Sequence, residues 1–396
     1  MEKLIYLMAF VMIFSSCSNR KNTNRSAQDQ DNQTEGAPLK KKGDLFMLVG
    51  TYTEDAGSKG IYVYQFDSKK AQTDSVSMVE VKNPSFLTIS PNQKFVYSVS
   101  ENGDDDSFAH SFSFNKNTGI LTAINSQNTY GGSPCYITTD GLGQNVLTAN
   151  YGGGSISVLP VSNDGQLSEV GTLITFSGKG ADSLKRQSAS HVHTVRFSPD
   201  GRYLFATDLG ADKIYRLNVN NTPFEGQPIL SESDIMEFAT PEGMGPRHLD
   251  FHPNMEYMYV LGEISGEVVV YDYNDGDITM KQTIASDSVG GQGSADIHVS
   301  PDGKFLYSSN RLKEDGIAIF SIDQKNGTLS RAGYQPTGRH PRNFSFTPNG
   351  KYLLVACRDD NKIQVFKVNQ DTGLLTSTEK DILLSKPVCI QFMSME

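Results

Sequence analysis

The sequence predicts an all-β protein made of repeated antiparallel sheets, and three observations lead to this prediction. The 396 residues include 36 Gly, 21 Phe and 17 Tyr, without the Ala, Leu, Lys and Glu runs of helical bundles. An apolar-alternating segment, a turn and a second such segment recur six times, at spacings of 47 to 59 residues. A second series of short Asn/Asp-Gly turns recurs in phase with the first.

The recurring unit predicts four antiparallel strands, here called A to D in chain order. Its A–B turn contains a proline or a residue taken to stand in its place, at Pro91, Asp140, Pro199, Pro253, Pro301 and Pro348. Tight turns between strands C and D are expected at 117–119, 163–165, 274–276, 326–327 and 371–373, where Gly or Asn supplies the positive φ. A four-stranded repeat of about 50 residues is typical of a β-propeller blade.

A seventh unit can be assembled from both ends of the chain. The segment 387–392 resembles strand A, and 45–53 and 60–66 supply the next two strands. The sequence therefore predicts a seven-bladed β-propeller of four-stranded antiparallel blades over residues 44–396, its ring closed by the N- and C-terminal strands. Separate all-β domains are the alternative, which a single repeat phase from residue 45 to 392 disfavours.

The first residues follow a different pattern. Lys3 precedes an apolar run that ends in Phe14-Ser15-Ser16-Cys17, which is too short for a mature membrane span and resembles a bacterial lipoprotein signal. We expect residues 1–17 to be a signal peptide ending at the lipidated Cys17, and residues 18–43 to be a flexible polar tether. The alternative is an ordinary secretory signal with an incidental cysteine. The expected location is lipid-anchored outside the inner membrane, at the outer membrane facing the periplasm, because Ser18 is not the Asp of inner-membrane retention.

Charge and cysteine content exclude some partners. The net charge is −10, and without residues 1–43 it is −13, from 28 basic and 41 acidic residues. Nucleic acid is therefore not an expected partner. The remaining cysteines, Cys135, Cys357 and Cys389, lack CxxC spacing, so we expect buried thiols and no metal site.

Two positions of the repeat carry polar residues where a core would need small or apolar ones. Six residues before the turn position stand Ser85, Pro134, His193, Arg247, Ala295 and Arg342, and ten after it stand Glu101, Asn150, Leu209, Glu263, Arg311 and Arg358. Both positions fall at the end of the blade opposite the A–B turn, so their side chains should converge on one end of the central channel.

This concentration of charge predicts an anion-binding site with groups that can transfer protons. Guanidinium groups match carboxylate or phosphate, and Glu263 and His193 can titrate. We predict catalytic roles for His193, Arg247, Glu263 and Arg311. Substrate contacts are predicted for Arg342, Arg358, Glu101 and Asn150. The alternative is bracing of neighbouring blades by ion pairs, for Arg342 and Arg358 with Asp359 or Glu101.

Other features support different expectations. The insertion 176–190 carries Lys179, Lys185 and Arg186, and is either a basic lip over the channel mouth or a solvated loop. His191 and His193 alternate along a strand, but no third metal ligand is evident. We interpret His248, His252 and His298 as structural histidines. No Gly-x-Ser-x-Gly nucleophile motif is present.

The repeat motifs also resemble a known family. The stretches HTVRFSPDGRYL, GPRHLDFHPN, YMYVLGEISGEVVVY, ADIHVSPDGKFLYSSNR and RNFSFTPNGKYLLVA are similar to the bacterial propeller-type 6-phosphogluconolactonase family, related to fungal carboxy-muconate lactonising enzymes. The resemblance spans residues 45–392. It implies an active site formed by His193, Arg247, Glu263 and Arg311, the same four residues as the repeat positions.

The expected function is hydrolysis of an anionic or sugar-acid lactone in the central funnel, without a cofactor. Water would attack the ring carbonyl, Glu263 or His193 would accept its proton, and Arg247 or Arg311 would stabilise the oxyanion. The alternatives are a muconate-type lactonising cycloisomerase and a non-catalytic, lipid-anchored propeller that binds a ligand or partner.

Overall fold

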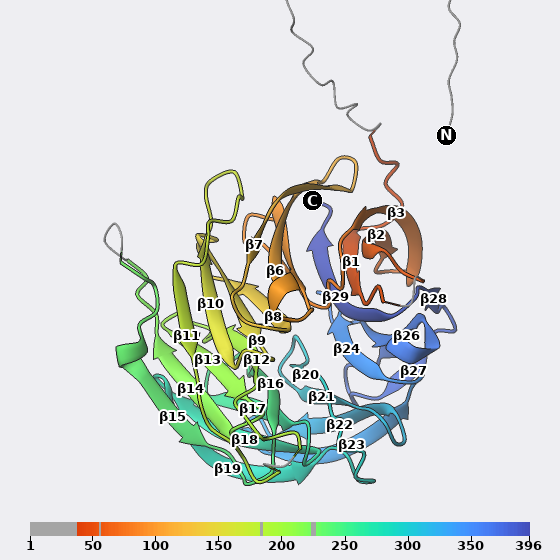
Figure 1. The fold of residues 1–396 in the computed structure, drawn as a ribbon. Coiled ribbons are helices and arrows are strands. Elements are labelled where there is room, and N and C mark those ends of the chain that lie inside the picture. The colour runs from red at the N-terminus through yellow and green to blue at the C-terminus, as the bar shows by residue number, and fades with distance from the viewer. Residues whose placement is uncertain (1–37, 55–56, 183–184, 223–226) are drawn as a thin grey trace, which may run out of the picture. The chain divides into compact units, whose positions relative to one another are not determined.

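The computed structural model describes residues 38–54, 57–182, 185–222 and 227–396. The predicted signal peptide, Cys17 and most of the predicted tether lie outside these ranges. Within the described ranges the chain forms seven antiparallel sheets and three short 3₁₀ helices. None of the described helices has the length and apolar character needed to cross a membrane. The predicted seven-bladed β-propeller is confirmed (Figure 1).

Each blade consists of one four-stranded sheet, and the seventh carries an additional short strand. Blade 1 contains β29 (Pro387–Ser394), β1 (Leu45–Thr51), β2 (Gly60–Asp67) and β3 (Gln72–Glu80). Blade 2 contains β4 (Leu87–Ile89), β5 (Phe95–Ser100), β6 (Phe108–Asn115) and β7 (Ile120–Asn128). Blade 3 contains β8 (Pro134–Thr139), β9 (Asn145–Asn150), β10 (Ser155–Pro160) and β11 (Thr172–Thr175).

The remaining blades follow the same order. Blade 4 contains β12 (Val192–Phe197), β13 (Tyr203–Asp208), β14 (Lys213–Asn218) and β15 (Ile235–Ala239), and blade 5 contains β16 (Pro246–Phe251), β17 (Tyr257–Gly262), β18 (Glu267–Asn274) and β19 (Asp277–Ala285). Blade 6 contains β20 (Ile297–Val299), β21 (Phe305–Asn310), β22 (Gly316–Ile322) and β23 (Leu329–Pro336). Blade 7 contains β24 (Pro341–Phe346), β25 (Tyr352–Cys357), β26 (Lys362–Val368), β27 (Leu375–Ser377) and β28 (Ile382–Leu383). The 3₁₀ helices are η1 (Asp104–Asp106), η2 (Glu232–Asp234) and η3 (Arg358–Asp360).

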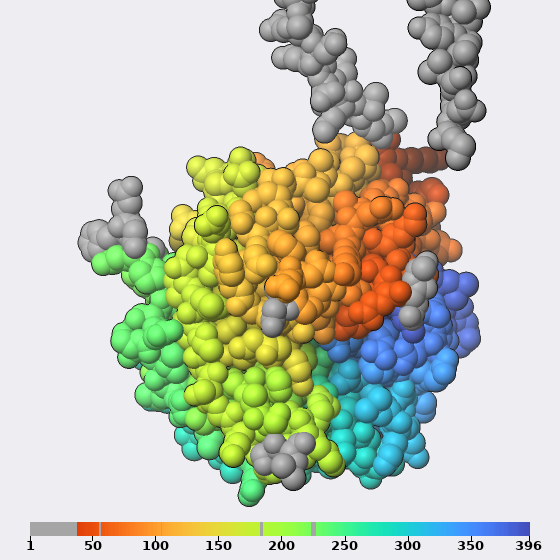
Figure 2. All heavy atoms as spheres, viewed as in Figure 1, coloured from red at the N-terminus to blue at the C-terminus, as the bar shows by residue number. Residues whose placement is uncertain are grey.

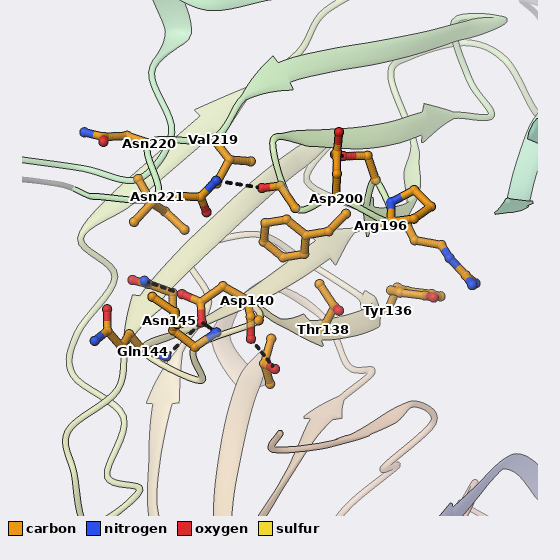
Figure 3. Close-up of a pocket in the computed structure, with 18 residues that line it drawn as sticks. Tyr136, Thr138, Asp140, Gln144, Asn145, Arg196, Asp200, Val219, Asn220 and Asn221 are labelled. Atoms are coloured by element: carbon orange, nitrogen blue, oxygen red, sulfur yellow. Dashed lines mark hydrogen bonds between the residues drawn. The ribbon is translucent and has the colours of Figure 1, made fainter. Parts of the chain in front are cut away.

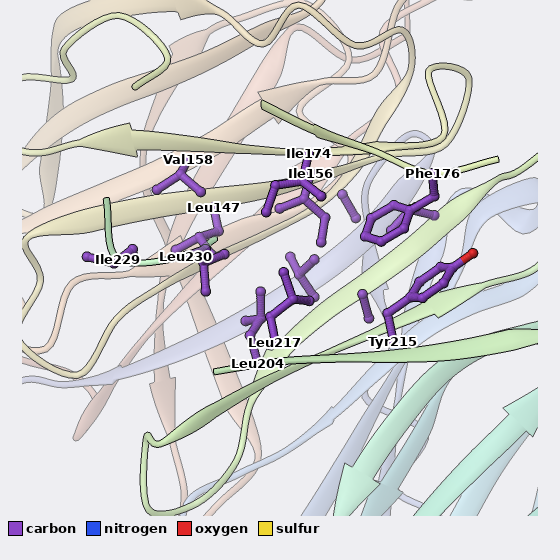
Figure 4. Packing of buried hydrophobic residues seen from close by; sticks show 14 residues of the cluster. Leu147, Ile156, Val158, Ile174, Phe176, Leu204, Tyr215, Leu217, Ile229 and Leu230 are labelled. Carbon is purple, nitrogen blue, oxygen red and sulfur yellow. The ribbon is translucent and has the colours of Figure 1, made fainter. Parts of the chain in front are cut away.

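The blades are held together by apolar side chains on their facing surfaces. Between blades 3 and 4, Leu147 and Ile156 pack against Leu204 and Leu217, and all four are fully buried (Figure 4). Burial of one such side chain contributes about 1.5–3 kcal/mol. Inner strands such as β9 and β17 are buried along their whole length, as packing between blades on both faces of a sheet requires.

The C–D turn glycines have a packing role in addition to their backbone conformation. Gly327 has a φ of +72°, and a Cβ there would lie 2.3 Å from the ring of Tyr257 in the preceding blade. The Tyr259 hydroxyl donates to the carbonyl of Gly327 at 3.0 Å. The C–D turn of one blade therefore packs on the B strand of the preceding blade. This contact explains why the A–B and C–D turns repeat in phase along the chain.

The ring closes between the first and last segments of the chain. Strand β29 pairs antiparallel with β1, with Val49 opposite Ile390 and Gly50 opposite Cys389. Figure 2 shows the blue surface of blade 7 beside the red-orange surface of the N-terminal strands. The predicted closure is confirmed, and it gives β1 a partner on the side away from β2.

One part of the repeat alignment is wrong. In blades 2, 4 and 6, the residue before the turn proline donates its amide to the carbonyl of the first B-strand residue, as Ser300 does to Phe305. In blade 3, Asp140 makes this bond to Asn145, so Asp140 stands in the serine position and Gly141 in the proline position. Counted from Gly141, the two site positions of blade 3 are Cys135 and Tyr151 rather than Pro134 and Asn150.

Candidate functional site

In four blades the residue six before the turn occupies a β-bulge at the start of the A strand. In blade 5, Pro246 pairs with Gly262 and His248 with Leu261, so Arg247 has no opposite residue. The same register shift leaves three other residues without an opposite residue in their blades: His193, Arg342 and Cys135. A bulge redirects one side chain out of the alternation of a strand. This explains why an A strand packed on both faces can present a charged residue at its end.

The residues ten after the turn directly follow the B strands. Glu263 comes after β17, and its amide donates to the carbonyl of Gly245 at 2.8 Å. In blade 1 the residue in the corresponding place is Tyr52, whose amide donates to Lys386 at 3.0 Å. The bulge residue and the residue after strand B thus come together at the same end of each blade.

Glu263 is the centre of the cluster. Its carboxylate accepts from Arg247 Nε at 2.7 Å and from Arg186 Nη2 at 2.7 Å, and Arg311 Nη2 lies 3.3 Å from it. Burial raises the pKa of this carboxyl, but Arg311, Arg247 and Arg186 together lower it to about 2. Glu263 is therefore an anion shared by three guanidinium groups.

Arg247 and Arg311 are both almost completely buried. Nη1 of Arg247 donates to the carbonyl of Ala295 and to His248 Nε2, the latter at 3.1 Å. Arg311 donates from Nε to the carbonyl of Gly293 at 2.5 Å, and its Nη1 lies 3.1 Å from His340 Nε2. Burial and the nearby arginines lower the pKa of Arg311 to about 9, against the opposing effect of Glu263. The two guanidinium groups are held in fixed orientations.

His193 lies in a mainly uncharged environment beside the arginines. Its Nδ1 is 3.6 Å from Cys135 Sγ, and its ring meets those of Tyr151 and His248 edge to face at 5.6 and 5.1 Å. Burial, assisted by Arg247 and His248, holds the pKa of His193 well below its usual range. The imidazole is therefore neutral at pH 7 and can accept a proton.

Arg342 and Arg358 form the ion pairs named as the bracing alternative. Arg342 Nη2 is 3.2 Å from Glu101, which also accepts from the Tyr52 hydroxyl at 2.8 Å. The Arg342 guanidinium lies over the Tyr52 ring. Arg358 Nε donates to Asp359 at 2.8 Å. Arg342 and Glu101 join blades 7 and 2 across the inner end, whereas Arg358 pairs with its neighbour in sequence.

Asn150 is the one predicted site residue that the structure does not bring to this cluster. Its amide donates to Ser155 and Ser157, and its oxygen accepts from Thr148, so its contacts lie within blade 3. The reason is the one-residue error described above. Tyr151 takes the expected place and stacks on His191, with ring centroids 4.4 Å apart.

Sequence reasoning missed Tyr52, Cys135, Tyr151 and His340 as members of the cluster. Cys135 and Tyr151 could have been found by aligning the bond-forming residue of each turn instead of its proline. Tyr52 follows β1, and blade 1 has no A–B turn to align because β29 comes from the other end of the chain. Arg186 was included in the predicted basic lip, and it does reach the cluster. His340 lies outside both repeat positions, so the repeat gave no signal for it.

The other sequence expectations concern histidines and cysteines. His248, His252 and His298 are hydrogen-bonded to Asp296, Gly303 and Asp296 respectively, as expected for structural histidines. Cys135, Cys357 and Cys389 are free and buried, as predicted. Among the residues that the structure describes, no group of three or more His, Cys, Asp and Glu is arranged to hold a metal ion.

Two cavities lie at opposite ends of the blades. One of about 770 Å³ opens between the A–B turns of blades 3 and 4, and none of the predicted site residues lines it (Figure 3). Another, of about 450 Å³, is bordered by His340, Asp359 and Leu312. The second cavity adjoins the arginine cluster.

The fold and the cluster define a class of protein: a seven-bladed propeller with buried arginines and a neutral histidine around one glutamate. The chain belongs to the lactonase family of seven-bladed β-propellers, since the family described as "Lactonase, 7-bladed beta-propeller" matches residues 46–392. The resemblance stated from the sequence motifs is thereby confirmed.

Individual relatives cover nearly the whole domain. The 6-phosphogluconolactonase of Formosa agariphila is 36% identical over 354 residues, which is 88% of this chain and 99% of the relative. That of Bacillus subtilis is 36% identical over 353 residues, 87% and 97% of the two chains. The structure of the Pseudomonas aeruginosa periplasmic gluconolactonase PpgL is 32% identical, with a TM-score of 0.82 and coverage of 89% and 99%.

Proposed function

We propose that the protein hydrolyses a sugar-acid lactone at the cluster around Glu263, in the inner end of the propeller channel. The observation that carries this proposal is a neutral imidazole, His193, beside two buried guanidinium groups held by one carboxylate. Lactone hydrolysis needs a proton acceptor for water and a donor for the oxyanion, and this arrangement supplies both. The hydrolases named among the relatives favour hydrolysis over cycloisomerisation.

The proposed reaction assigns different roles to His193 and Glu263. Water attacks the carbonyl carbon, and its proton passes to His193 as the C–O bond forms. The oxyanion accepts hydrogen bonds from Arg247. When the ring C–O bond breaks, the imidazolium returns the proton to the leaving alkoxide, which gives the free hydroxy acid. Glu263 orients the arginines, because both of its oxygens already accept hydrogen bonds from guanidinium groups.

The charge of the cluster favours an anionic substrate. The repeat positions contribute four arginines and two glutamates, a net charge of +2 in a chain of −10. Arg342 and Arg358 border the same end, where they can contact a carboxylate or phosphate group of the lactone. The Bacillus subtilis relative is named for a phosphorylated gluconolactone, and PpgL is named for gluconolactone.

A lactone panel tests this function directly. Acid release at constant pH is measured for gluconolactone and 6-phosphogluconolactone, with wild-type protein and with His193→Gln. We expect hydrolysis of at least one lactone above the buffer rate, and a loss of kcat in the variant because the proton acceptor is removed. Rates equal to buffer for both lactones would overturn the proposal and favour a binding propeller.

We also propose that Cys17 anchors the protein to lipid outside the inner membrane. The Lys3-to-Cys17 pattern supports this, as does the periplasmic location in the name of PpgL. The full-length chain is expected in the membrane fraction, and Cys17→Ala in the soluble periplasmic fraction. Retention of the Cys17→Ala protein in the membrane would contradict the anchor.

A further inference from the structure

His248 determines how Arg247 is oriented. It follows Arg247 in β16, is buried, and places Nε2 3.1 Å from Arg247 Nη1. On the other side of the ring, Nδ1 lies 2.7 Å from Asp296 Oδ1. A carboxylate can only accept a hydrogen bond, so the Nδ1 atom carries the proton and Nε2 carries the lone pair. Arg247 can then donate to Nε2.

Asp296 is held as an anion that can play this role. It is 2% exposed, and its second oxygen accepts from Asn343 Nδ2 at 2.6 Å and lies 3.1 Å from His298 Nε2. The backbone amides of Ile297 and Phe344 donate to it as well. Although burial raises the pKa of Asp296, His298 and His248 hold it well below its usual range.

A second histidine contacts Arg311, with different partners. His340 Nε2 lies 3.1 Å from Arg311 Nη1. Its Nδ1 lies 3.2 Å from Arg358 Nη2 and 3.4 Å from Asp359 Oδ2. Burial and the adjacent arginines lower the pKa of His248 to about 4 and that of His340 to about 3, so both rings are neutral. Arg247 and Arg311 thus each contact a neutral histidine, and in His248 a hydrogen-bonded carboxylate fixes the tautomer.

We propose that Asp296 and His248 are positioning residues for Arg247 in the lactonase reaction proposed above, and that His340 supplies a hydrogen-bond acceptor for Arg311. In Arg247, Nε is bound by Glu263, and Nη1 by Ala295 and His248. Nη2 has no partner among the described residues and is the nitrogen presented to the substrate. The function of His248 is to accept a hydrogen bond, which requires a fixed tautomer. This inference depends on the proposed function.

Asp296→Asn tests the tautomer. The second oxygen of Asp296 faces three donors, from Asn343, His298 and Phe344, so the amide of Asn will place its oxygen there and its NH₂ toward His248. The proton of His248 must then move to Nε2, where it faces the Arg247 donor. We expect kcat to fall by about 10²-fold, the scale for a misplaced reacting group, with little change in KM.

A pair of His248 variants distinguishes the loss of the hydrogen-bond acceptor from the loss of side-chain packing. Gln can place its oxygen near the position of Nε2, whereas Leu cannot accept a hydrogen bond. We expect His248→Gln to keep most of the wild-type kcat and His248→Leu to lose about 10²-fold. His252→Gln is the matched control. His252 is a buried histidine directly after β16, at the A–B turn end of the blade, and its ring contacts the carbonyl of Gly303. It should lower thermal stability without changing kcat.

The same pair at His340 provides the second measurement if the His248 variants do not fold. His340→Gln should again retain kcat and His340→Leu should lose it. Wild-type kcat in Asp296→Asn, or equal kcat in the Gln and Leu variants of one histidine, would overturn the positioning role. Failure of the underlying lactonase proposal is distinguishable, since it would leave the wild-type protein without activity.

Discussion

The two ends of the blades differ in how their equivalent residues are used. At the A–B turn end, Ser198 and Ser300 both donate a side-chain hydrogen bond at 2.6 Å to the aspartate two residues on, Asp200 and Asp302. At the opposite end, equivalent positions hold His193, Arg247 and Arg342, which contact different partners. Side chains that repeat from blade to blade maintain the fold, whereas side chains that differ at equivalent backbone positions indicate a site.

The largest expected effect comes from removing the central charge of the cluster. Glu263→Gln leaves three arginines around a neutral amide, and loss of one partner of a buried ion pair costs about 3–5 kcal/mol. The free energy of unfolding, measured in urea, should decrease by this amount. Glu256→Gln, at an exposed position of the same blade, is the control and should unfold as wild type does. An unchanged urea midpoint for Glu263→Gln would show that the ion pairs of Glu263 do not stabilise the fold.

The next effect concerns catalysis. Arg247→Ala and Arg311→Ala should each lower kcat/KM for an anionic lactone by about 10²-fold or more, the result of losing one charge-assisted contact to the transition state. Lys304→Ala, at the turn end, should leave kcat/KM unchanged, because Lys304 pairs with Asp302 at the surface. If the arginine variants melt earlier but turn over normally, the arginines brace the blades and the catalytic assignment of these positions fails.

His298, which lies between the two ends, predicts a pH dependence of stability. Burial lowers its pKa, but Asp296 and Asp250 raise it to about 9, above the ordinary value of 6.5. Its charged form therefore stabilises the fold fully below pH 6.5, and this stabilisation is lost as the pH rises through 9. The Tm should fall by several degrees between pH 6.5 and 9.5. His298→Gln should remove most of this slope, and an equal slope in the variant would exclude His298 as its source.

The smallest effect is expected at a single turn. Asp302→Ala removes the acceptor for Ser300 and for the amide of Lys304, which should lower the free energy of unfolding by about 1 kcal/mol. The measurement is urea unfolding together with kcat, and kcat should not change. A large loss of activity would mean that the turn end communicates with the cluster, contrary to the division proposed here.

The sequence predicted the blade count and the ring closure because both depend on local periodicity. The site was predicted in part. His193, Arg247, Glu263 and Arg311 come together, whereas Asn150 does not, because blade 3 has no turn proline to mark its phase. Contacts that cross between blades could not be read from spacing. Arg186 reaches Glu263 from a loop, and His340 reaches Arg311 from the next blade, and both contacts depend on how the blades pack in three dimensions.

The pairing of β29 with β1 has a consequence for how the protein is made. The innermost strand of blade 1, β29, follows all the other described strands in the chain, so the first strands emerge long before their partner exists. During that interval β1 has an unpaired edge, which is a site for mispairing and aggregation. A nascent chain that stops before Pro387 would carry six complete blades and an open one. Completion of blade 1 therefore waits until Pro387–Ser394 has been translated.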